Sequence, residues 1–151
     1  MLNKFMLYIG ITLLSLLPFS SMAANTDTDA ITDTITRSYF QGAYNALDTD
    51  AMAQGFHEDF AILGADGEKL ERYTIKSWIA AINKRKAQAG FNIAAAKRDC
   101  KIIQIDQTNG AASAKVEIYK EGKILYTDYL SLVKFPSGWK IVSKVYADHS
   151  H

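Results

Sequence analysis

The stretch ASAKVEIYKEGKILYTDYLSLVKFPSGWKIVSKVY, residues 112–146, decides the fold. Apolar and polar residues alternate along it with a period of two, which is typical of β-strands. The turn signals Glu121-Gly122 and Pro136-Ser137-Gly138 divide it into segments at 112–120, 123–135 and 139–146. Connections this short join antiparallel neighbours, so we expect three strands of a meander. A further strand is expected at 100–106, before the turn signal Asn109-Gly110.

The residues before this meander have a helical period instead. Residues 27–47 predict an amphipathic helix, because apolar side chains recur at every fourth position, namely Ile31, Ile35, Tyr39, Ala43 and Leu47. Asp48-Thr49-Asp50 predicts the cap of a short second helix, and a strand is expected at 60–63. Thr74 predicts the cap of a third helix. Helices followed by a meander indicate an α+β fold, which we assign to one domain over 24–151.

The turns also assign faces to the sheet. If Glu121-Gly122 is a two-residue turn, Ile118 pairs with Leu125 and Val116 with Thr127, and directly opposed residues share a face. One face then carries no charge: Val116, Ile118, Leu125, Thr127, Tyr129, Ser131, Val133, Phe135, Trp139, Ile141, Ser143 and Val145. We expect this uncharged face to pack against the helices. The mixed face, with Tyr126, Asp128, Leu130, Leu132 and Lys144, is expected outside.

Charge and composition exclude several classes of protein. The chain has 151 residues with 17 Lys+Arg and 16 Asp+Glu, a net charge of +1. Nucleic-acid binders normally have a clear basic excess, so this balance argues against a nucleic-acid partner. A single cysteine excludes an internal disulfide framework.

Residues 1–23 have the pattern of an export signal. Lys4 precedes an apolar run at 5–19, and the small residues Ser21 and Ala23 suit a signal peptidase. The run is shorter than the about 20 residues that span a bilayer. We therefore expect cleavage after Ala23 and a periplasmic or secreted protein without a stable membrane anchor, with an uncleaved anchor as the alternative.

The chain resembles a known family in three stretches: Phe56-His57-Glu58-Asp59-Phe60, Thr127-Asp128-Tyr129-Leu130-Ser131-Leu132, and Trp139-Lys140-Ile141-Val142-Ser143-Lys144-Val145. With the order of elements, they resemble the nuclear transport factor 2-like superfamily and, within it, the putative lumazine-binding family. The resemblance implies a cone-shaped fold, in which three N-terminal helices pack on a curved antiparallel sheet. Relatives include small-molecule binders, polyketide cyclases, steroid isomerases and dehydratases, and a fold does not choose among these functions.

The assigned faces predict a pocket with a few hydroxyl groups. Its expected ligand-binding residues are Tyr39, His57, Trp78, Thr127, Tyr129, Ser131 and Ser143. Buried hydroxyls need partners, which indicates water, a ligand or mutual hydrogen bonds. The pocket would be apolar and uncharged, which favours a small hydrophobic or neutral aromatic ligand. The alternative is that aromatic side chains fill this space, since protein interiors leave few voids.

Catalysis is the alternative function, as an isomerase, dehydratase or cyclase. His57 and Asp59 form the best acid/base candidate, because histidine is the residue type suited to proton transfer at physiological pH and Asp59 lies two residues away. Asp128 is expected instead to form a cross-strand ion pair with Lys115 or Lys144 on the outer face. An isomerase of the steroid type needs a carboxylate inside the cavity, where the assigned register places none.

The remaining expectations concern partners and metals. The mixed face suits a homodimer interface, with Tyr126, Leu130, Leu132, Val142 and Tyr146 amid charges. A dimeric interaction module without ligand is a third possible function. Cys100 suits buried packing or, less well, intermolecular pairing. His149 and His151 are too few for a zinc site, so we expect a frayed tail and neither cofactor nor metal.

Overall fold

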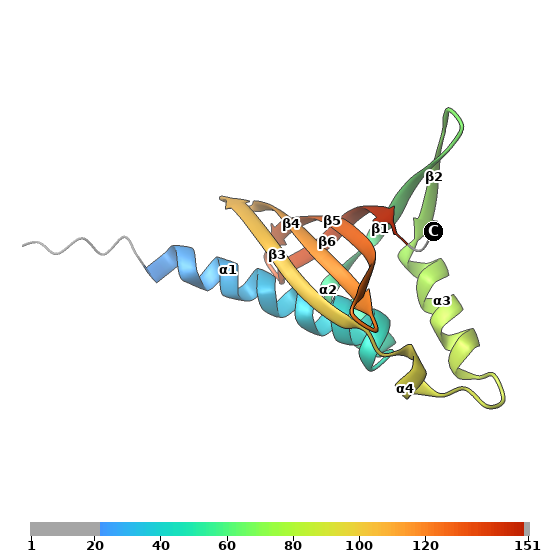
Figure 1. Cartoon of the computed structure of the whole chain (residues 1–151). Helices are drawn as coiled ribbons and strands as arrows, with labels where there is room; N and C mark the ends of the chain where they lie inside the picture. Colours follow the sequence, from blue (N-terminus) through green and yellow to red (C-terminus); the bar gives the residue numbers. More distant parts are fainter. Residues whose placement is uncertain (1–21, 150–151) are drawn as a thin grey trace, which may run out of the picture.

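The computed structural model describes residues 22–149 of the chain (Figure 1). Its helical segments are, in chain order, α1 (Met22–Thr34), η1 (Ile35–Asn45), α2 (Thr49–Gly55), α3 (Ile75–Lys86) and α4 (Ile93–Ala96). Its strands are β1 (Phe56–Asp66), β2 (Lys69–Thr74), β3 (Asp99–Thr108), β4 (Ala111–Lys120), β5 (Lys123–Phe135) and β6 (Gly138–Asp148). The expected α+β fold, with helices packed on a curved sheet, is confirmed, and the sheet is antiparallel except between β1 and β6.

The first long helix consists of α1 followed directly by η1, which is a π-helix. Every residue of the predicted stripe is buried, with at most 3% of any side chain exposed. In an α-helix 3.6 residues make a turn, whereas the i→i+5 bonds of a π-helix make the turn wider. The spacing of four lies between these two periods. The stripe therefore faces the sheet along the whole helix.

Two predicted caps start the next helices. Asp48 Oδ1 accepts hydrogen bonds from the N–H groups of Asp50 and Ala51, at 3.1 and 3.0 Å. Thr74 Oγ1 accepts one from the Ser77 N–H at 3.2 Å. α2 packs closely on η1, where a Cβ on Gly42 would lie 2.7 Å from Met52 Cγ. The predicted starts of α2 and α3 are confirmed, whereas the first helix begins before Thr28 and Asp29, at the first described residues.

The six strands form one sheet in the order β2-β1-β6-β5-β4-β3. β1 runs parallel to β6, and the other neighbours are antiparallel. Figure 1 shows β1 and β2 projecting as a hairpin beyond the rest of the sheet. The sequence did not predict β2, because all six of its residues are exposed and no buried face imposes an alternation.

The predicted register between β4 and β5 is wrong by one residue. The two-residue turn itself is confirmed, since Lys120 pairs with Lys123, and Glu121 and Gly122 have φ values of 52° and 78°. Beyond the turn, however, Ile118 pairs with Tyr126, which leaves Leu125 as an extra residue. Side chains alternate between the two faces of a strand. This β-bulge therefore exchanges the faces of β5 from Tyr126 onward.

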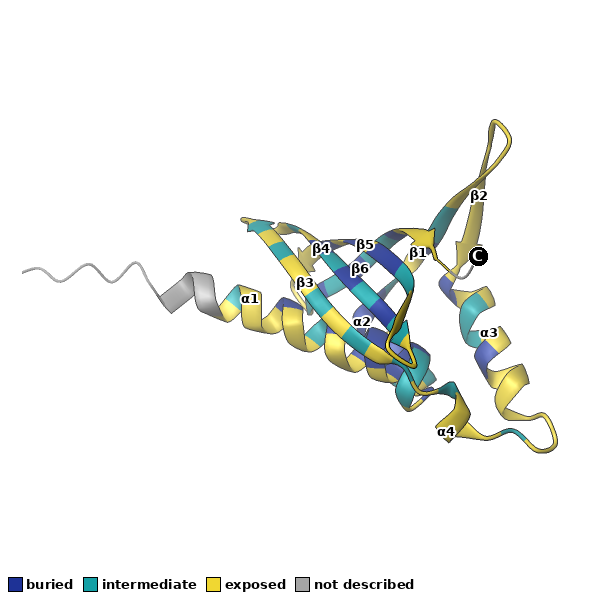
Figure 2. Ribbon diagram, in the orientation of Figure 1, coloured by how far each residue is buried: buried dark blue, intermediate teal, exposed yellow. Residues whose placement is uncertain are grey.

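The inner face of the sheet consequently differs from the predicted one (Figure 2). Asp128, Leu130 and Leu132 are buried on β5, whereas Tyr129, Ser131 and Val133 are exposed. A second shift follows Ser131, so that Leu132 pairs with Ile141. It leaves Val142 unpaired and turns Lys144 inward together with Ile141 and Trp139, all three of which are buried.

The turn between β5 and β6 differs in length from the expected one. Phe135 pairs with Gly138, so the loop has two residues rather than three. The predicted Ser131–Ser143 pair is nevertheless confirmed, because the shift near Val142 compensates for the shorter loop. This serine pair lies on the outer face.

Residues 1–21, which hold most of the expected export signal, lie outside the described residues. Among residues 22–149, no helix is both long enough and apolar enough to cross a membrane. Export and cleavage after Ala23 stay predictions.

Two neighbouring residues on β5 provide a test of this register. Leu130→Ala should lower the free energy of unfolding by about 2–5 kcal/mol, because Leu130 is 1% exposed and its truncation leaves a cavity. Tyr129→Ala should change the free energy of unfolding of the single chain, measured at a concentration too low for association, by no more than about 0.5 kcal/mol, because Tyr129 is 51% exposed there. Urea unfolding of both variants measures the difference. A larger loss of stability in Tyr129→Ala than in Leu130→Ala would contradict the bulge at Leu125 and support the register without it.

Candidate functional site

A cavity of about 530 Å³ lies between α3, η1 and the inner face of the sheet, and we call it the inner cavity. Its lining includes Tyr44, Ile62, Tyr73, Trp78, Arg85, Arg98, Tyr126, Lys144 and Tyr146. Aromatic rings and cations dominate this set, and no carboxylate is among the described residues that line the cavity. The expectation of an uncharged pocket therefore does not fit this cavity.

Four polar side chains meet at the wall of the inner cavity: two of them line it, and the other two lie behind these. Lys144 Nζ lies 3.1 Å from Asp128 Oδ1 and donates a hydrogen bond to the Tyr39 hydroxyl at 3.0 Å. The Tyr39 hydroxyl in turn donates to Asp128 Oδ2 and lies 3.3 Å from the Tyr44 hydroxyl. These residues come from β6, β5 and η1, so the group joins the long helix to the centre of the sheet. We call it the buried quartet.

The charges of the buried quartet are almost completely withdrawn from water. Asp128 is 0% exposed and Lys144 is 4% exposed. Asp128 Oδ1 contacts the ammonium as an ion pair but accepts no directed hydrogen bond from any described residue. The carboxylate therefore depends on Lys144 for its compensation, because an unpaired buried charge is strongly destabilising.

Burial changes the acidity of the groups around Asp128. Desolvation lowers the pKa of Lys144, and the neighbouring carboxylate opposes this shift. Desolvation raises the pKa of Tyr39 well above its usual value, and the neighbouring Tyr44 and Asp128 raise it further. The pKa of Tyr44 is raised for the same main reason, with Asp128 as the next cause. Both phenols consequently stay protonated at neutral pH and serve as hydrogen-bond donors.

Aromatic rings surround the Lys144 ammonium. Nζ lies 4.9 Å from the ring centre of Tyr146, 5.3 Å from that of Tyr39 and 5.4 Å from that of Trp78. Such distances allow cation–π attraction, which is stronger in a desolvated site. Trp78 also packs edge-on against Tyr39 and Phe56. The indole therefore has a fixed position between the core and the inner cavity.

Two arginines lie at the rim of the inner cavity. Arg98 donates from Nη1 to the carbonyl oxygens of Ala96 and Lys97, at 3.0 and 2.8 Å, and its backbone N–H donates to Asn45 Oδ1. The Arg85 guanidinium lies 5.9 Å from the ring centre of Phe91. These contacts hold both side chains, and both arginines line the inner cavity.

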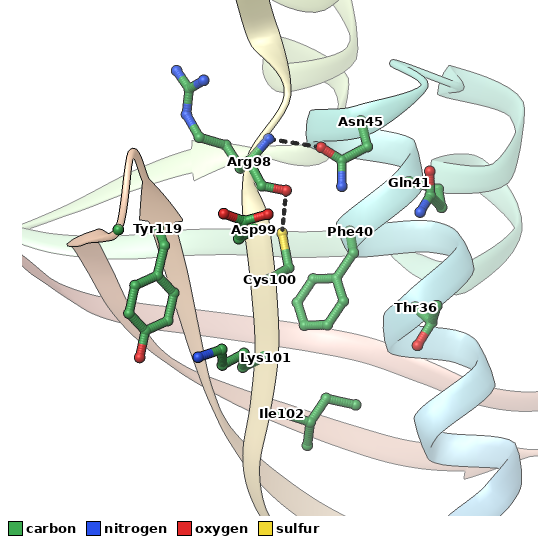
Figure 3. Close-up of a pocket in the computed structure, with 11 residues that line it drawn as sticks. Thr36, Phe40, Gln41, Asn45, Arg98, Asp99, Cys100, Lys101, Ile102 and Tyr119 are labelled. Carbon is green, nitrogen blue, oxygen red and sulfur yellow. Dashed lines mark hydrogen bonds between the residues drawn. The ribbon is translucent and has the colours of Figure 1, made fainter. Parts of the chain in front are cut away.

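A second, larger hollow of about 760 Å³ lies between η1 and β3 (Figure 3), and we call it the outer groove. Thr36, Gln41, Asp99 and Lys101 line it, and all four are exposed. Cys100 is half-buried there, and burial raises the pKa of its thiol to about 12, so the thiol is protonated at neutral pH. The inner cavity is the better candidate site, because only its wall contains a buried ion.

Two of the sequence-predicted ligand residues contribute to the inner cavity and its wall. Trp78 lines the cavity, and Tyr39 belongs to the buried quartet behind it. His57 and Asp59 lie together, with Nδ1 and Oδ2 3.7 Å apart, but His57 stacks on Phe135 and neither residue lines the inner cavity. A role for His57 or Asp59 in catalysis stays an untested prediction.

The other four predicted ligand residues lie on the outer face of the sheet, because of the bulge at Leu125. Tyr129 and Ser131 are exposed, and Ser143 pairs with Ser131. Thr127 is buried, but its hydroxyl bonds to His149 Nε2 at 3.0 Å. The expected frayed tail is wrong for His149, whose N–H also donates to the Leu125 carbonyl. His151 lies outside the described residues.

Sequence reasoning missed the roles of Tyr44, Tyr126, Asp128, Lys144 and Tyr146 at this site. The ion pair of Asp128 with Lys144 was expected and is confirmed, but it lies inside the fold rather than outside. Lys115 is not its partner, since it pairs with Tyr129. Leu130 and Leu132 lie on the same face of β5 as Asp128 and are both strongly apolar. These two leucines were the sequence signal that this face, and not the opposite one, packs against the helices.

The described part of the chain contains no group of three or more His, Cys, Asp or Glu side chains that could hold a metal ion.

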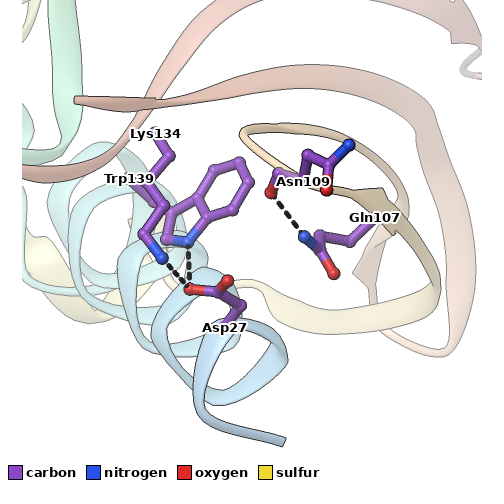
Figure 4. Close-up of polar contacts among 5 residues, drawn as sticks. All are labelled: Asp27, Gln107, Asn109, Lys134 and Trp139. Atoms are coloured by element: carbon purple, nitrogen blue, oxygen red, sulfur yellow. Dashed lines mark hydrogen bonds and ion pairs between the residues drawn. The ribbon is translucent and has the colours of Figure 1, made fainter. Parts of the chain in front are cut away.

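Trp139, the second tryptophan, lies away from the inner cavity. Its indole Nε1 donates to Asp27 Oδ1 at 3.2 Å, and Lys134 Nζ contacts the same oxygen at 2.6 Å (Figure 4). These hydrogen bonds lower the pKa of Asp27. They fasten α1 to the turn between β5 and β6 and leave Trp78 as the only tryptophan beside the inner cavity among the described residues.

Buried tyrosines predict a loss of stability at alkaline pH. A folded-state pKa above the unfolded value of 10.0 stabilises the fold at lower pH, and this contribution is lost as pH rises above 10. Each such tyrosine should reduce the free energy of unfolding by about 1.4 kcal/mol per pH unit in that range. Tyr44→Phe removes one of them, so urea unfolding between pH 8 and 11 should give a shallower decline. An unchanged decline would contradict the burial of this hydroxyl.

Comparison with known proteins agrees with this fold. The sequence matches the family model described as putative lumazine-binding over residues 26–147. An NTF2-like protein of unknown function from Shewanella baltica OS155 is 26% identical, with a TM-score of 0.67 over 87% of this chain and 100% of that chain. Another, from Methylobacillus flagellatus KT, is 27% identical, with a TM-score of 0.63 over 87% of this chain and 98% of that chain.

A third NTF2-like protein of unknown function, from Silicibacter pomeroyi DSS-3, is 21% identical and shares the fold, with a TM-score of 0.65 over 85% of this chain and 100% of that chain. No curated protein matches the sequence. Because the family model spans nearly all of the described domain, this chain belongs to the family described as putative lumazine-binding, and its fold is NTF2-like.

Proposed function

We propose that the protein binds a small planar aromatic molecule in the inner cavity. The observation that carries this proposal is the Lys144 ammonium, which is buried, lines the cavity and has three aromatic rings around it. The volume of the inner cavity, about 530 Å³, suits a small ligand, since ligand cavities commonly measure about 300–1,000 Å³. The family description and the NTF2-like fold are consistent with a small-molecule-binding domain.

The side chains around the inner cavity favour a ligand with a polar, oxygen-bearing end. Flat rings of the ligand would pack against Trp78 and the tyrosines. A carbonyl or carboxylate oxygen would accept from Lys144 or face the arginines at the rim. This replaces the neutral ligand expected from sequence, because the exchanged register turns a cation toward the cavity. Lumazine, a flat heterocycle with carbonyl oxygens, belongs to the proposed class.

The catalytic alternative gains one feature from the exchanged register. Asp128 provides the internal carboxylate that an isomerase of the steroid type would need. However, Asp128 is held by Tyr39 and Lys144 and is not among the residues that line the inner cavity. Binding is therefore the function that we propose.

Tryptophan fluorescence tests this proposal with a matched pair of variants. Trp139→Phe leaves Trp78 as the sole tryptophan, and saturable quenching of its emission by 2-naphthoate should persist. Trp78→Phe leaves Trp139, which lies away from the inner cavity, and the quenching should disappear. Naphthalene, which lacks the carboxylate, should bind at least about tenfold more weakly, because a hydrogen bond to a charged group contributes about 1.5–3 kcal/mol. Equal quenching of both variants would refute binding in this cavity.

The dimer interface expected from sequence is wrong in its residues, because Leu130 and Leu132 are buried in the core. We also propose that two copies of the chain associate through the outer face of the sheet, defined by Tyr129, Ser131, Val133, Ser143 and Val145. Tyr129, Val133 and Val145 are 51%, 37% and 47% exposed on the neighbouring strands β5 and β6. Tyr129 pairs with Val145, and the small serines between them leave this face even. A self-complementary apolar patch suits a two-fold interface.

Sedimentation velocity tests the proposed dimer. The wild type should sediment as a dimer at micromolar concentration, and Tyr129→Lys should give a folded monomer because it places two like charges at the interface. Leu70→Lys is the control, since Leu70 is 61% exposed on the projecting hairpin, away from the outer face. If only Leu70→Lys dissociated the dimer, the proposed interface would be wrong and the hairpin of β1 and β2 would form the contact instead.

A further inference from the structure

We propose that Lys144 is a carbonyl-reactive amine, which forms an imine with an aromatic aldehyde or ketone bound in the inner cavity. The inference deepens the proposed function, because it uses the same cavity and adds a covalent step to binding. Lys144 is the only amine among the described residues that line this cavity.

The neighbours of Lys144 are those that imine formation requires. A reactive lysine needs desolvation to weaken its hold on a proton, together with nearby groups that transfer protons. Lys144 is 4% exposed, and its burial lowers the pKa of the amine. The Tyr39 hydroxyl lies 3.0 Å from Nζ and also bonds to Asp128, so amine, phenol and carboxylate form a continuous path for a proton.

The reaction balances with these groups alone. The ammonium first gives one proton to Asp128, either directly or through Tyr39. Nζ then attacks the carbonyl carbon, and the N–C bond forms while the C=O π electrons move to oxygen. The carbinolamine oxygen receives the second proton from nitrogen and the proton held by Asp128, and it leaves as water. The product is a protonated imine with one positive charge, as the ammonium had.

Conservation of charge makes this step compatible with the fold. Asp128 is 0% exposed and depends on a positive charge within ion-pair distance. The protonated imine keeps that charge on the same nitrogen, so the carboxylate remains compensated after the reaction. The Trp78 and Tyr146 rings beside Nζ would then stack on the aromatic part of the substrate. The substrate class is accordingly a planar aromatic aldehyde or ketone.

Reductive trapping tests the proposal on the wild-type protein. 2-Naphthaldehyde and cyanoborohydride should convert the imine to a stable secondary amine, and peptide mass mapping should place it at Lys144. Lys140, on the same strand, is the internal control because its ammonium faces the protein surface, where it donates to the Gln54 carbonyl. We expect labelling at Lys144 to exceed that at Lys140 by about tenfold or more. Equal or weaker labelling of Lys144 would overturn the proposal.

Two variants and one ligand separate this inference from simple binding. Lys144→Arg keeps the cation but lacks a nucleophilic amine, so trapping at position 144 should vanish while circular dichroism reports the fold. Tyr39→Phe keeps Lys144 and its direct contact with Asp128 but removes the phenol that relays a proton between them, so trapping should slow by about tenfold. 2-Naphthol has no carbonyl group. Saturable quenching of Trp78 by 2-naphthol, together with no labelling of Lys144 by 2-naphthaldehyde and cyanoborohydride, would overturn the imine and leave the binding proposal standing.

Discussion

The ion pair between Asp128 and Lys144 is the constraint on which the rest of the structure depends. A carboxylate that is 0% exposed requires a cation close by, because an uncompensated buried charge destabilises a protein by about 3–5 kcal/mol. The two residues come from the neighbouring strands β5 and β6. Both bulges are necessary for the pair, since each strand must turn a charged side chain inward. Asp128 and Lys144, which would face solvent in a sheet without bulges, are therefore buried on its inner face.

The long helix formed by α1 and η1 contacts this ion pair directly. Tyr39 lies on the buried stripe, and its hydroxyl bonds to Lys144 and Asp128 at once. The π-helical part of the helix, η1, supplies Tyr39 and Tyr44, whose hydroxyls lie 3.3 Å apart. A five-residue separation brings these two side chains together because π-helical bonds join residues i and i+5. The π-helical segment therefore brings both phenols of the buried quartet to the same side of the helix, next to the ion pair.

Most of the fold could be predicted from local signals, and the site could not. Strand ends follow turns such as Glu121-Gly122, and helix starts follow caps such as Asp48 and Thr74, so a few adjacent residues determine each. The position of Leu125, in contrast, depends on what the two faces of β5 pack against. Nothing within the turn distinguishes a regular ladder from a bulged one. One extra residue then reversed the assignment of every side chain beyond it, Asp128 included.

The exchange of faces also changes how the uncharged residues of β5 are interpreted, because it places them on the outside of the sheet. Tyr129, Ser131 and Val133 were grouped because they carry no charge, and charge-free positions normally indicate a core. In the structure these residues are exposed, and the charged Asp128 is buried beside them. An uncharged row on the outside of a single copy is unusual for a solvated sheet, where polar residues alternate with apolar ones. The row is explained if a second copy covers it, so that both faces of β5 are buried, one by the helices and the other by the partner.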